Sequence, residues 1–164
     1  MKTQTKIMEP ETLLEDYRRL LQEDPSIDAL PLVITGNSMS PFLIHGRDTV
    51  YLSRLTRSVR RGDMLLYRRE NGNYVLHRVF KAEPESLTMI GDAQTILEPG
   101  IRQDQVMAIV TRVERKGKPL GPDSFWWAFF EKIWIRIVPL RRGIHRVYTI
   151  GKRVSSRGRH DRGD

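Results

Sequence analysis

One serine lies in a segment whose composition suits a nucleophile. Ser38 stands in residues 36–41 (GNSMSP), directly after the apolar run of residues 31–35 (PLVIT). Glycine and proline restrict such a turn, so they would hold the hydroxyl in one place at the end of a strand. Covalent catalysis requires a nucleophile that is aligned with the reacting carbon at about 3 Å. The same composition is also typical of an ordinary turn, and this segment alone does not decide between the two.

Two later segments supply a base and an acid for that serine. His77 lies in residues 74–79 (YVLHRV), and Asp92 lies in residues 90–93 (IGDA). Neutral imidazole accepts a hydroxyl proton near pH 7, and an acid beside it holds the tautomer and stabilises the imidazolium. The alternative is an ordinary strand histidine and an aspartate that begins a turn.

The order of these segments resembles the signal peptidase family of serine peptidases. S-M-x-P is followed by R-G-D before a strand, by a base on the next strand and then by G-D, all between Val33 and about Val113. Histidine in the L-H-R-V segment is similar to the archaeal and endoplasmic-reticulum branch, whereas the bacterial branch and the repressor-type self-cleaving peptidases carry lysine there. The resemblance implies that Ser38 is the nucleophile, His77 the general base and Asp92 an acid that orients or charges the base.

The resemblance also implies how substrate would be held, and the chain departs from the family pattern at two places. Met39 and Pro41 would shape the turn and the adjoining substrate cleft. The family often has a hydroxyl two residues before the nucleophile as a second oxyanion donor, and Gly36 stands there in this chain. Of the acids that the family carries after Gly-Asp, residues 93–98 (AQTILE) keep only Glu98.

The elements that must position these residues are mainly β. Leucines and a tyrosine in residues 10–23 form one stripe at helical spacing and predict an amphipathic helix. From Leu30 to about Arg115, six short β-like runs alternate with turn signals, including Asn-Gly-Asn at residues 71–73. The predicted fold is a coiled antiparallel β-sheet or barrel of the signal-peptidase type, with an N-terminal amphipathic helix and a C-terminal aromatic helix. The expected divisions are a helix and linker (1–29), the β catalytic domain (30–116), an aromatic segment (117–150) and a basic disordered tail (151–164).

The aromatic segment suits a membrane surface. Residues 125–140 (FWWAFFEKIWIRIVPL) combine tryptophan and phenylalanine with Lys132 and Arg136, and Arg141 and Arg142 follow. Tryptophan favours the headgroup boundary, and arginine attracts anionic lipid. We therefore expect membrane association through Phe125 to Leu140 on an undetermined side of the membrane, with a cytoplasmic protein as the alternative. A second interpretation is a helix that packs these residues onto the β domain.

Composition excludes several other classes. The net charge is +8, and residues 132–164 account for all of it, with ten Lys or Arg against two Asp. That basic end has no interleaved aromatic residues after Tyr148, so we expect no nucleic-acid partner. The chain has no cysteine, and its four histidines are scattered, so we expect no metal.

The leading functional hypothesis is a serine endopeptidase of signal-peptidase type that cleaves a precursor peptide through an acyl-enzyme. Such Ser-His chemistry needs no cofactor. One alternative is a peptide-binding module that kept the fold without turnover. Another is a cytoplasmic peptidase of the repressor type, although only about 35 residues precede Ser38 and they contain no Ala-Gly or Cys-Gly bond.

Overall fold

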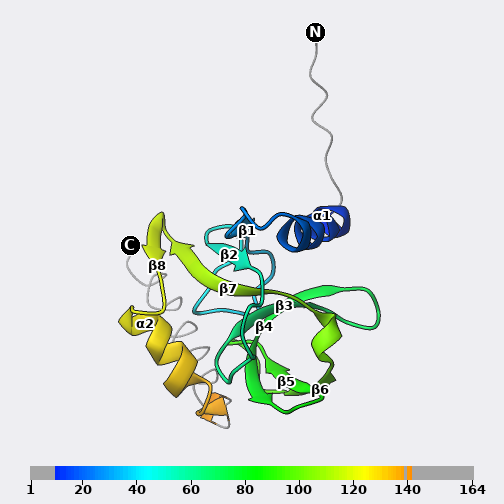
Figure 1. Cartoon of the computed structure of the whole chain (residues 1–164). Helices are drawn as coiled ribbons and strands as arrows, with labels where there is room; N and C mark the ends of the chain where they lie inside the picture. The colour runs from blue at the N-terminus through cyan, green and yellow to red at the C-terminus, as the bar shows by residue number, and fades with distance from the viewer. Residues whose placement is uncertain (1–9, 139, 142–164) are drawn as a thin grey trace, which may run out of the picture.

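The computed structural model describes residues 10–138, 140 and 141 (Figure 1). The predictions for residues 1–9 and 142–164, which include the basic tail, lie outside the described residues. Helix α1 (Pro10–Glu23) has the predicted bounds. Its Leu14 and Leu21 are buried, whereas Leu20 is 40% exposed. The predicted amphipathic helix is therefore confirmed, and its apolar stripe packs onto the sheet.

The strands form one antiparallel sheet that is not closed. Its strands run in the order β1-β2-β7-β3-β4-β5-β6, and β8 pairs with the far end of β7. The mainly β prediction is confirmed, and its barrel alternative is wrong, because the two ends of this order, β1 and β6, are not paired with each other. The strands are β1 (Leu30–Val33), β2 (Thr49–Ser53), β3 (Met64–Arg68), β4 (Tyr74–Ala82), β5 (Leu87–Ile90), β6 (Glu98–Ile101), β7 (Val106–Arg115) and β8 (Lys118–Leu120). A short 3₁₀ turn, η1 (Gln103–Gln105), precedes β7.

The central strand β3 is covered on both faces, which explains why its sequence is continuously apolar. Met64 and Leu66 belong to one core cluster, and Leu65 and Tyr67 belong to another. Because alternate residues of a strand point to opposite faces, the two clusters lie on opposite sides of the sheet.

Strand register then sorts the candidate residues between those two faces. Leu65 pairs with His77, so His77 shares a face with Tyr67, two residues along β3. Arg78 is the next residue of β4, so it points to the other face.

The C-terminal segment packs against the sheet domain. Helix α2 (Phe125–Ala128) is capped by Ser124, whose Oγ accepts a hydrogen bond from Trp127 N at 3.3 Å. It continues into the π-helical turn η2 (Phe129–Trp134). The rings of Trp127 and Phe130 lie 6.1 and 4.9 Å from that of Phe42. In the described part of the chain, every helix is too short or too polar to cross a membrane.

Candidate active site

Ser38 and His77 line the same pocket of about 250 Å³, together with Gly36, Met39 and Gln94. Ser38 is half-buried in the turn that follows β1, whereas His77, on β4, is only 1% exposed. The fold therefore brings the proposed nucleophile and base to one cavity from separate elements.

Backbone contacts fix the turn that carries Ser38. The N–H of Ala93 donates to the carbonyl oxygen of Ser38 at 2.8 Å. A Cβ at Gly91 would lie 2.5 Å from that same oxygen, so only glycine allows this approach. Met39 is 2% exposed and anchors the turn in the core, while Pro41 is exposed and lies outside the pocket lining. The Ile-Gly-Asp segment thus acts as a support for the Ser38 turn.

The backbone N–H groups of Gly36 and Ser38 differ in whether they already have a hydrogen-bond acceptor. Gly36 adopts a φ of 82° and donates its N–H to His45 Nδ1 at 2.9 Å, so this group is already engaged. The N–H of Ser38 has no hydrogen-bond acceptor among the described residues. The Ser38 N–H is therefore the donor that remains for an oxyanion.

A chain of hydrogen bonds fixes the proton positions on His77. The Tyr67 hydroxyl donates to Glu98 Oε2 at 2.7 Å, and its oxygen lies 3.1 Å from His77 Nδ1. Arg69 holds both oxygens of Glu98, at 2.6 and 2.7 Å. Since the single Tyr67 proton goes to Glu98, His77 Nδ1 must carry the hydrogen and donate it to the Tyr67 oxygen. Nε2 of the neutral ring is then unprotonated and able to accept a proton.

Burial and charge favour this protonation state. Burial lowers the pKa of His77 to about 4, although the negative charge of Glu98 works in the opposite direction. The Arg69 hydrogen bonds lower the pKa of Glu98, and burial raises that of Tyr67. At neutral pH the imidazole is therefore neutral, the phenol protonated and the carboxylate charged.

Asp92 is engaged elsewhere. Its two carboxylate oxygens accept from Arg78 at 2.9 and 3.0 Å, and both side chains are fully buried. Ile90 pairs with Arg78 in the sheet, so Asp92, two residues further, follows the face of Arg78 and not that of His77. The hydrogen-bond partner of His77 Nδ1 is therefore Tyr67. Asp92 acts on His77 through its charge, which raises the pKa of the imidazole.

Sequence reasoning gave no role to Tyr67 and Arg69, and it noted Glu98 only as the one remaining acid. Glu98 pairs with Met89, which pairs with Val79, so the register carries the face of His77 across to Glu98. Only the Asn-Gly turn in the sequence could have pointed to Tyr67. This turn fixes the β3–β4 hairpin and so places Tyr67 diagonally across from His77.

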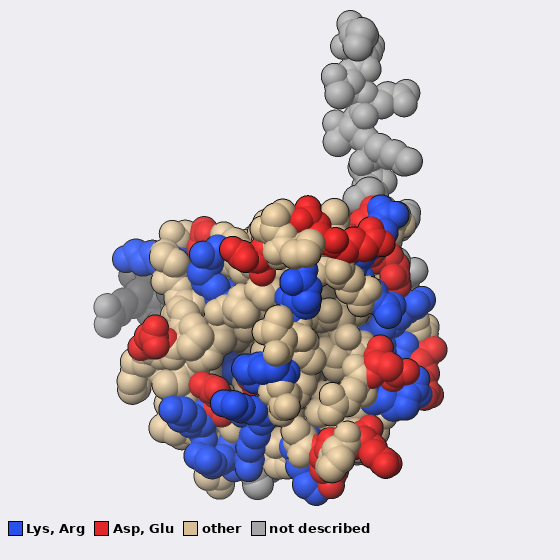
Figure 2. Space-filling view, in the orientation of Figure 1, with Lys and Arg blue, Asp and Glu red and all other residues tan. Residues whose placement is uncertain are grey.

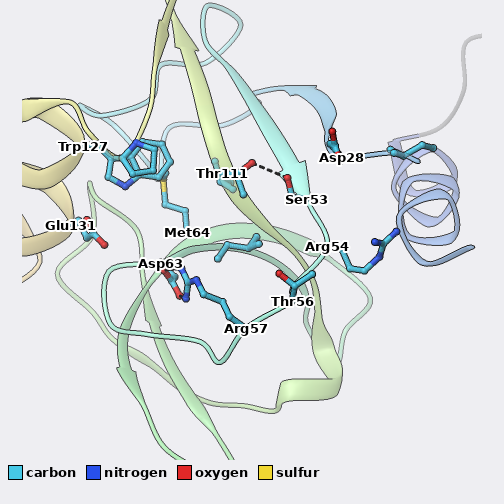
Figure 3. Close-up of a pocket in the computed structure, with 14 residues that line it drawn as sticks. Asp28, Ser53, Arg54, Thr56, Arg57, Asp63, Met64, Thr111, Trp127 and Glu131 are labelled. Atoms are coloured by element: carbon cyan, nitrogen blue, oxygen red, sulfur yellow. Dashed lines mark hydrogen bonds and ion pairs between the residues drawn. The ribbon is translucent and has the colours of Figure 1, made fainter. Parts of the chain in front are cut away.

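A larger cavity of about 480 Å³ lies away from Ser38, between β2, β7 and α2 (Figure 3). Two pairs of its polar side chains bind each other. Arg57 holds Asp63 with two hydrogen bonds at 2.7 and 2.8 Å, and the Ser53 and Thr111 hydroxyls pair at 2.8 Å. This cavity offers no nucleophile with a base, so it is not the candidate active site.

No family model, curated protein or solved structure matches this chain. Within residues 10–138, 140 and 141, no cluster of three or more potential metal ligands is present. The chemistry of the Ser38 pocket is therefore the basis for assigning a function.

Proposed function

We propose that this chain is a serine endopeptidase of the signal-peptidase type, with Ser38 as nucleophile and His77 as general base. The observation that carries the proposal is the proton arrangement of His77, Tyr67 and Glu98, which leaves Nε2 unprotonated on a buried histidine that lines the same pocket as Ser38.

In the proposed reaction, Nε2 takes the Ser38 proton as Oγ attacks the peptide carbonyl carbon. The tetrahedral oxyanion is held by the backbone N–H of Ser38. His77 then gives the proton to the leaving amine, which departs and leaves an acyl-enzyme on Oγ. A water molecule, deprotonated by the same nitrogen, attacks the ester carbon, and Nε2 returns that proton to Oγ as the acyl–oxygen bond breaks, which releases the acid and restores Ser38.

Glu98 compensates for the weakness of the base. A pKa of about 4 keeps His77 unprotonated, but it also lowers the affinity of Nε2 for the serine proton. The carboxylate of Glu98 lies 3.7 Å from His77 Nδ1, so its charge stabilises the imidazolium that forms during attack. Tyr67 and Arg69 are positioning residues in this scheme, because each acts through its neighbour.

An extended peptide fits the surroundings of the pocket. A second pocket of about 420 Å³ shares Ile34, Thr35, Tyr74 and Leu76 with the Ser38 pocket and continues to the apolar face of α1. Residues 31–35 line it, and β1 is the end strand of the sheet order. A precursor peptide that pairs with β1 as an added strand would extend toward Ser38, where its scissile carbonyl would be attacked.

The test is covalent labelling combined with cleavage. We expect wild type to react with a fluorophosphonate probe and to cleave a signal-peptide-like substrate. Ser38→Ala should lose both activities, and Ser40→Ala, which removes the neighbouring hydroxyl, should keep both. A folded wild-type protein that neither labels nor cleaves would overturn the proposal.

One observation favours a second candidate, a peptide-binding module without turnover. The Gly36 N–H is taken by His45, and the loss of one oxyanion donor costs about 3 kcal/mol of transition-state stabilisation in other serine peptidases. Peptide binding by wild type without labelling of Ser38 would support this candidate.

A further inference from the structure

The helical segment of residues 125–134 is apolar on two sides, although only one of them packs on the domain. The inward side chains, Trp127 and Phe130, are 6% and 4% exposed. The outward side chains, Phe125, Trp126 and Ile133, are 71%, 52% and 51% exposed. Surplus exposed aromatic area of this kind marks an interaction surface.

The outward aromatic rings form a cluster of their own. Phe125 lies 5.4 Å from Trp126 and 6.3 Å from Phe129, and Trp126 lies 6.0 Å from Phe129, between ring centroids. Leu140 adds a further apolar side chain that is 63% exposed. In Figure 1, α2 lies at the outer edge of the molecule, on the other side from α1.

Charge is divided between the two sides of the same segment. Glu131 is half-buried and lines the large cavity with Arg57. Lys132 and Arg136 are exposed, and within the described residues neither forms an ion pair with an acid. The acid therefore turns toward the protein and the cations toward solvent. We call Phe125, Trp126, Lys132, Ile133, Arg136 and Leu140 the outward face.

We propose that the outward face docks on an anionic lipid surface. Tryptophan rings lie well at the headgroup boundary, and neighbouring cations are attracted to anionic headgroups. Residues 132–164 carry the whole net charge of +8, so the charge of the chain is concentrated at this end. Lysine is depleted in interfaces between proteins, whereas an anionic bilayer attracts it.

The inward side of the same segment is bonded to residues that support the Ser38 turn. Trp134 Nε1 donates to the Asp92 carbonyl at 2.9 Å, and Arg141 donates to the carbonyls of Gly91 and Gln94 at 3.0 and 3.1 Å. The same turn donates from Ala93 to the carbonyl oxygen of Ser38. Lipid binding itself is independent of peptidase chemistry, so the two proposals fail separately.

The experiment is vesicle binding by the full chain. All three tryptophans lie between residues 126 and 134, so their emission reports this segment alone. With vesicles of phosphatidylcholine and phosphatidylglycerol (3:1), we expect co-sedimentation and a blue shift of the emission. With phosphatidylcholine alone, and at high salt, we expect weaker binding.

Two double variants and a matched control identify the surface. Phe125→Glu with Trp126→Glu should weaken co-sedimentation at least about tenfold, because the variant places charge where apolar side chains would insert. Lys132→Glu with Arg136→Glu should reduce the preference for phosphatidylglycerol, because it reverses the two cations of the outward face. Leu20→Glu, at an exposed leucine of α1, should bind like wild type. Circular dichroism establishes that each variant is folded.

Three results would overturn the proposal. Wild type could fail to bind either vesicle. The Phe125/Trp126 variant could bind as well as wild type, which would place the interaction on another part of the chain. Light scattering without lipid could show a dimer that Trp126→Glu abolishes, which would make the outward face a contact between copies.

Discussion

The protonation of the buried His77 imidazole determines the pH below which the proposed activity is lost. His77 must be neutral to accept the Ser38 proton, and burial lowers its pKa to about 4. We therefore expect kcat/KM to stay constant from neutral pH down to about 5 and to fall with an apparent pKa near 4. An unperturbed imidazole would give a fall near 6.5. The measurement is the pH–rate profile, corrected for the folded fraction, and a fall centred near 6.5 would show that the base is exposed to solvent.

Tyr67 decides which nitrogen of His77 is free. Tyr67→Phe removes the oxygen that accepts the Nδ1 hydrogen and keeps the ring volume. Nδ1–H then loses its nearest acceptor, since Glu98 Oε2 lies 3.7 Å away, so the tautomer with the proton on Nε2 gains population and the base is weakened. We expect kcat to fall about 10²-fold or more, as it does when a triad histidine takes the wrong tautomer. Thermal unfolding should show a folded protein, and an unchanged kcat would exclude the positioning role.

At the scale of the elements, strand register separates two acids that look interchangeable in the sequence. Asp92 shares a face with Arg78, and Glu98 shares one with His77. We expect Asp92→Asn to lower the free energy of unfolding by about 3 kcal/mol or more, because Arg78 remains buried without its partner. Its folded fraction should keep kcat within about tenfold of wild type. Urea unfolding and activity of the same sample measure both quantities.

Glu98→Gln is the matched control for that prediction. The amide cannot supply the charge that stabilises the imidazolium, so kcat should fall. Glu98 is also partly exposed, so the stability loss should be smaller than for Asp92→Asn. A drop in kcat of about 10⁴-fold in folded Asp92→Asn, with Glu98→Gln unaffected, would return the orienting role to Asp92.

Local sequence patterns predicted the elements better than their pairing. The helix over residues 10–23 and the six β-like runs were predicted correctly, because hydrophobic spacing and turn residues are local signals. Strand β6 was missed because its sequence, Glu-Pro-Gly-Ile, contains two residues that strands disfavour, and β8 has only three residues. The open sheet could not be predicted, since closure depends on whether β1 and β6 meet.

The candidate site could likewise be predicted only where local sequence patterns define it. Ser38 and His77 stand in recognisable segments, whereas the contact of Tyr67 with Glu98 joins residues 31 positions apart. That contact depends on the register of β4, β5 and β6, which includes two irregularities that no local pattern specifies. The family resemblance directed attention to Asp92 because it follows the glycine of the Gly-Asp pair.

At the scale of the whole molecule, one turn connects the segment that carries Ser38 to the C-terminal segment proposed to bind lipid. Residues 91–94 are bonded to the Ser38 turn on one side and to Trp134 and Arg141 on the other. Arg and Lys are spread over the face seen in Figure 2 among Asp and Glu. The excess of basic residues is instead a property of residues 132–164. A lipid surface bound to α2 would lie on the other side of the molecule from α1 (Figure 1).

Acid stability of the whole fold provides the last prediction, because it reports the burial of His77 without any substrate. The pKa of His77 is about 4 in the folded state, against an ordinary value of 6.5. Between these values the unfolded chain binds more protons than the folded one, so stability falls as the pH falls. The lowered pKa values of Asp48 and Glu98 add to the loss below about pH 4.

The expected size of this effect is about 3 kcal/mol between pH 7 and pH 4, given about 1.4 kcal/mol for each pKa unit. Urea unfolding at pH 7, 5.5 and 4.5, followed by tryptophan emission without lipid, measures the slope. His77→Gln should show a clearly flatter slope over this range, because glutamine does not titrate. Equal slopes for wild type and His77→Gln would mean that the imidazole is accessible to protons in the folded protein. In that case the buried, neutral base required for attack by Ser38 would not exist in solution.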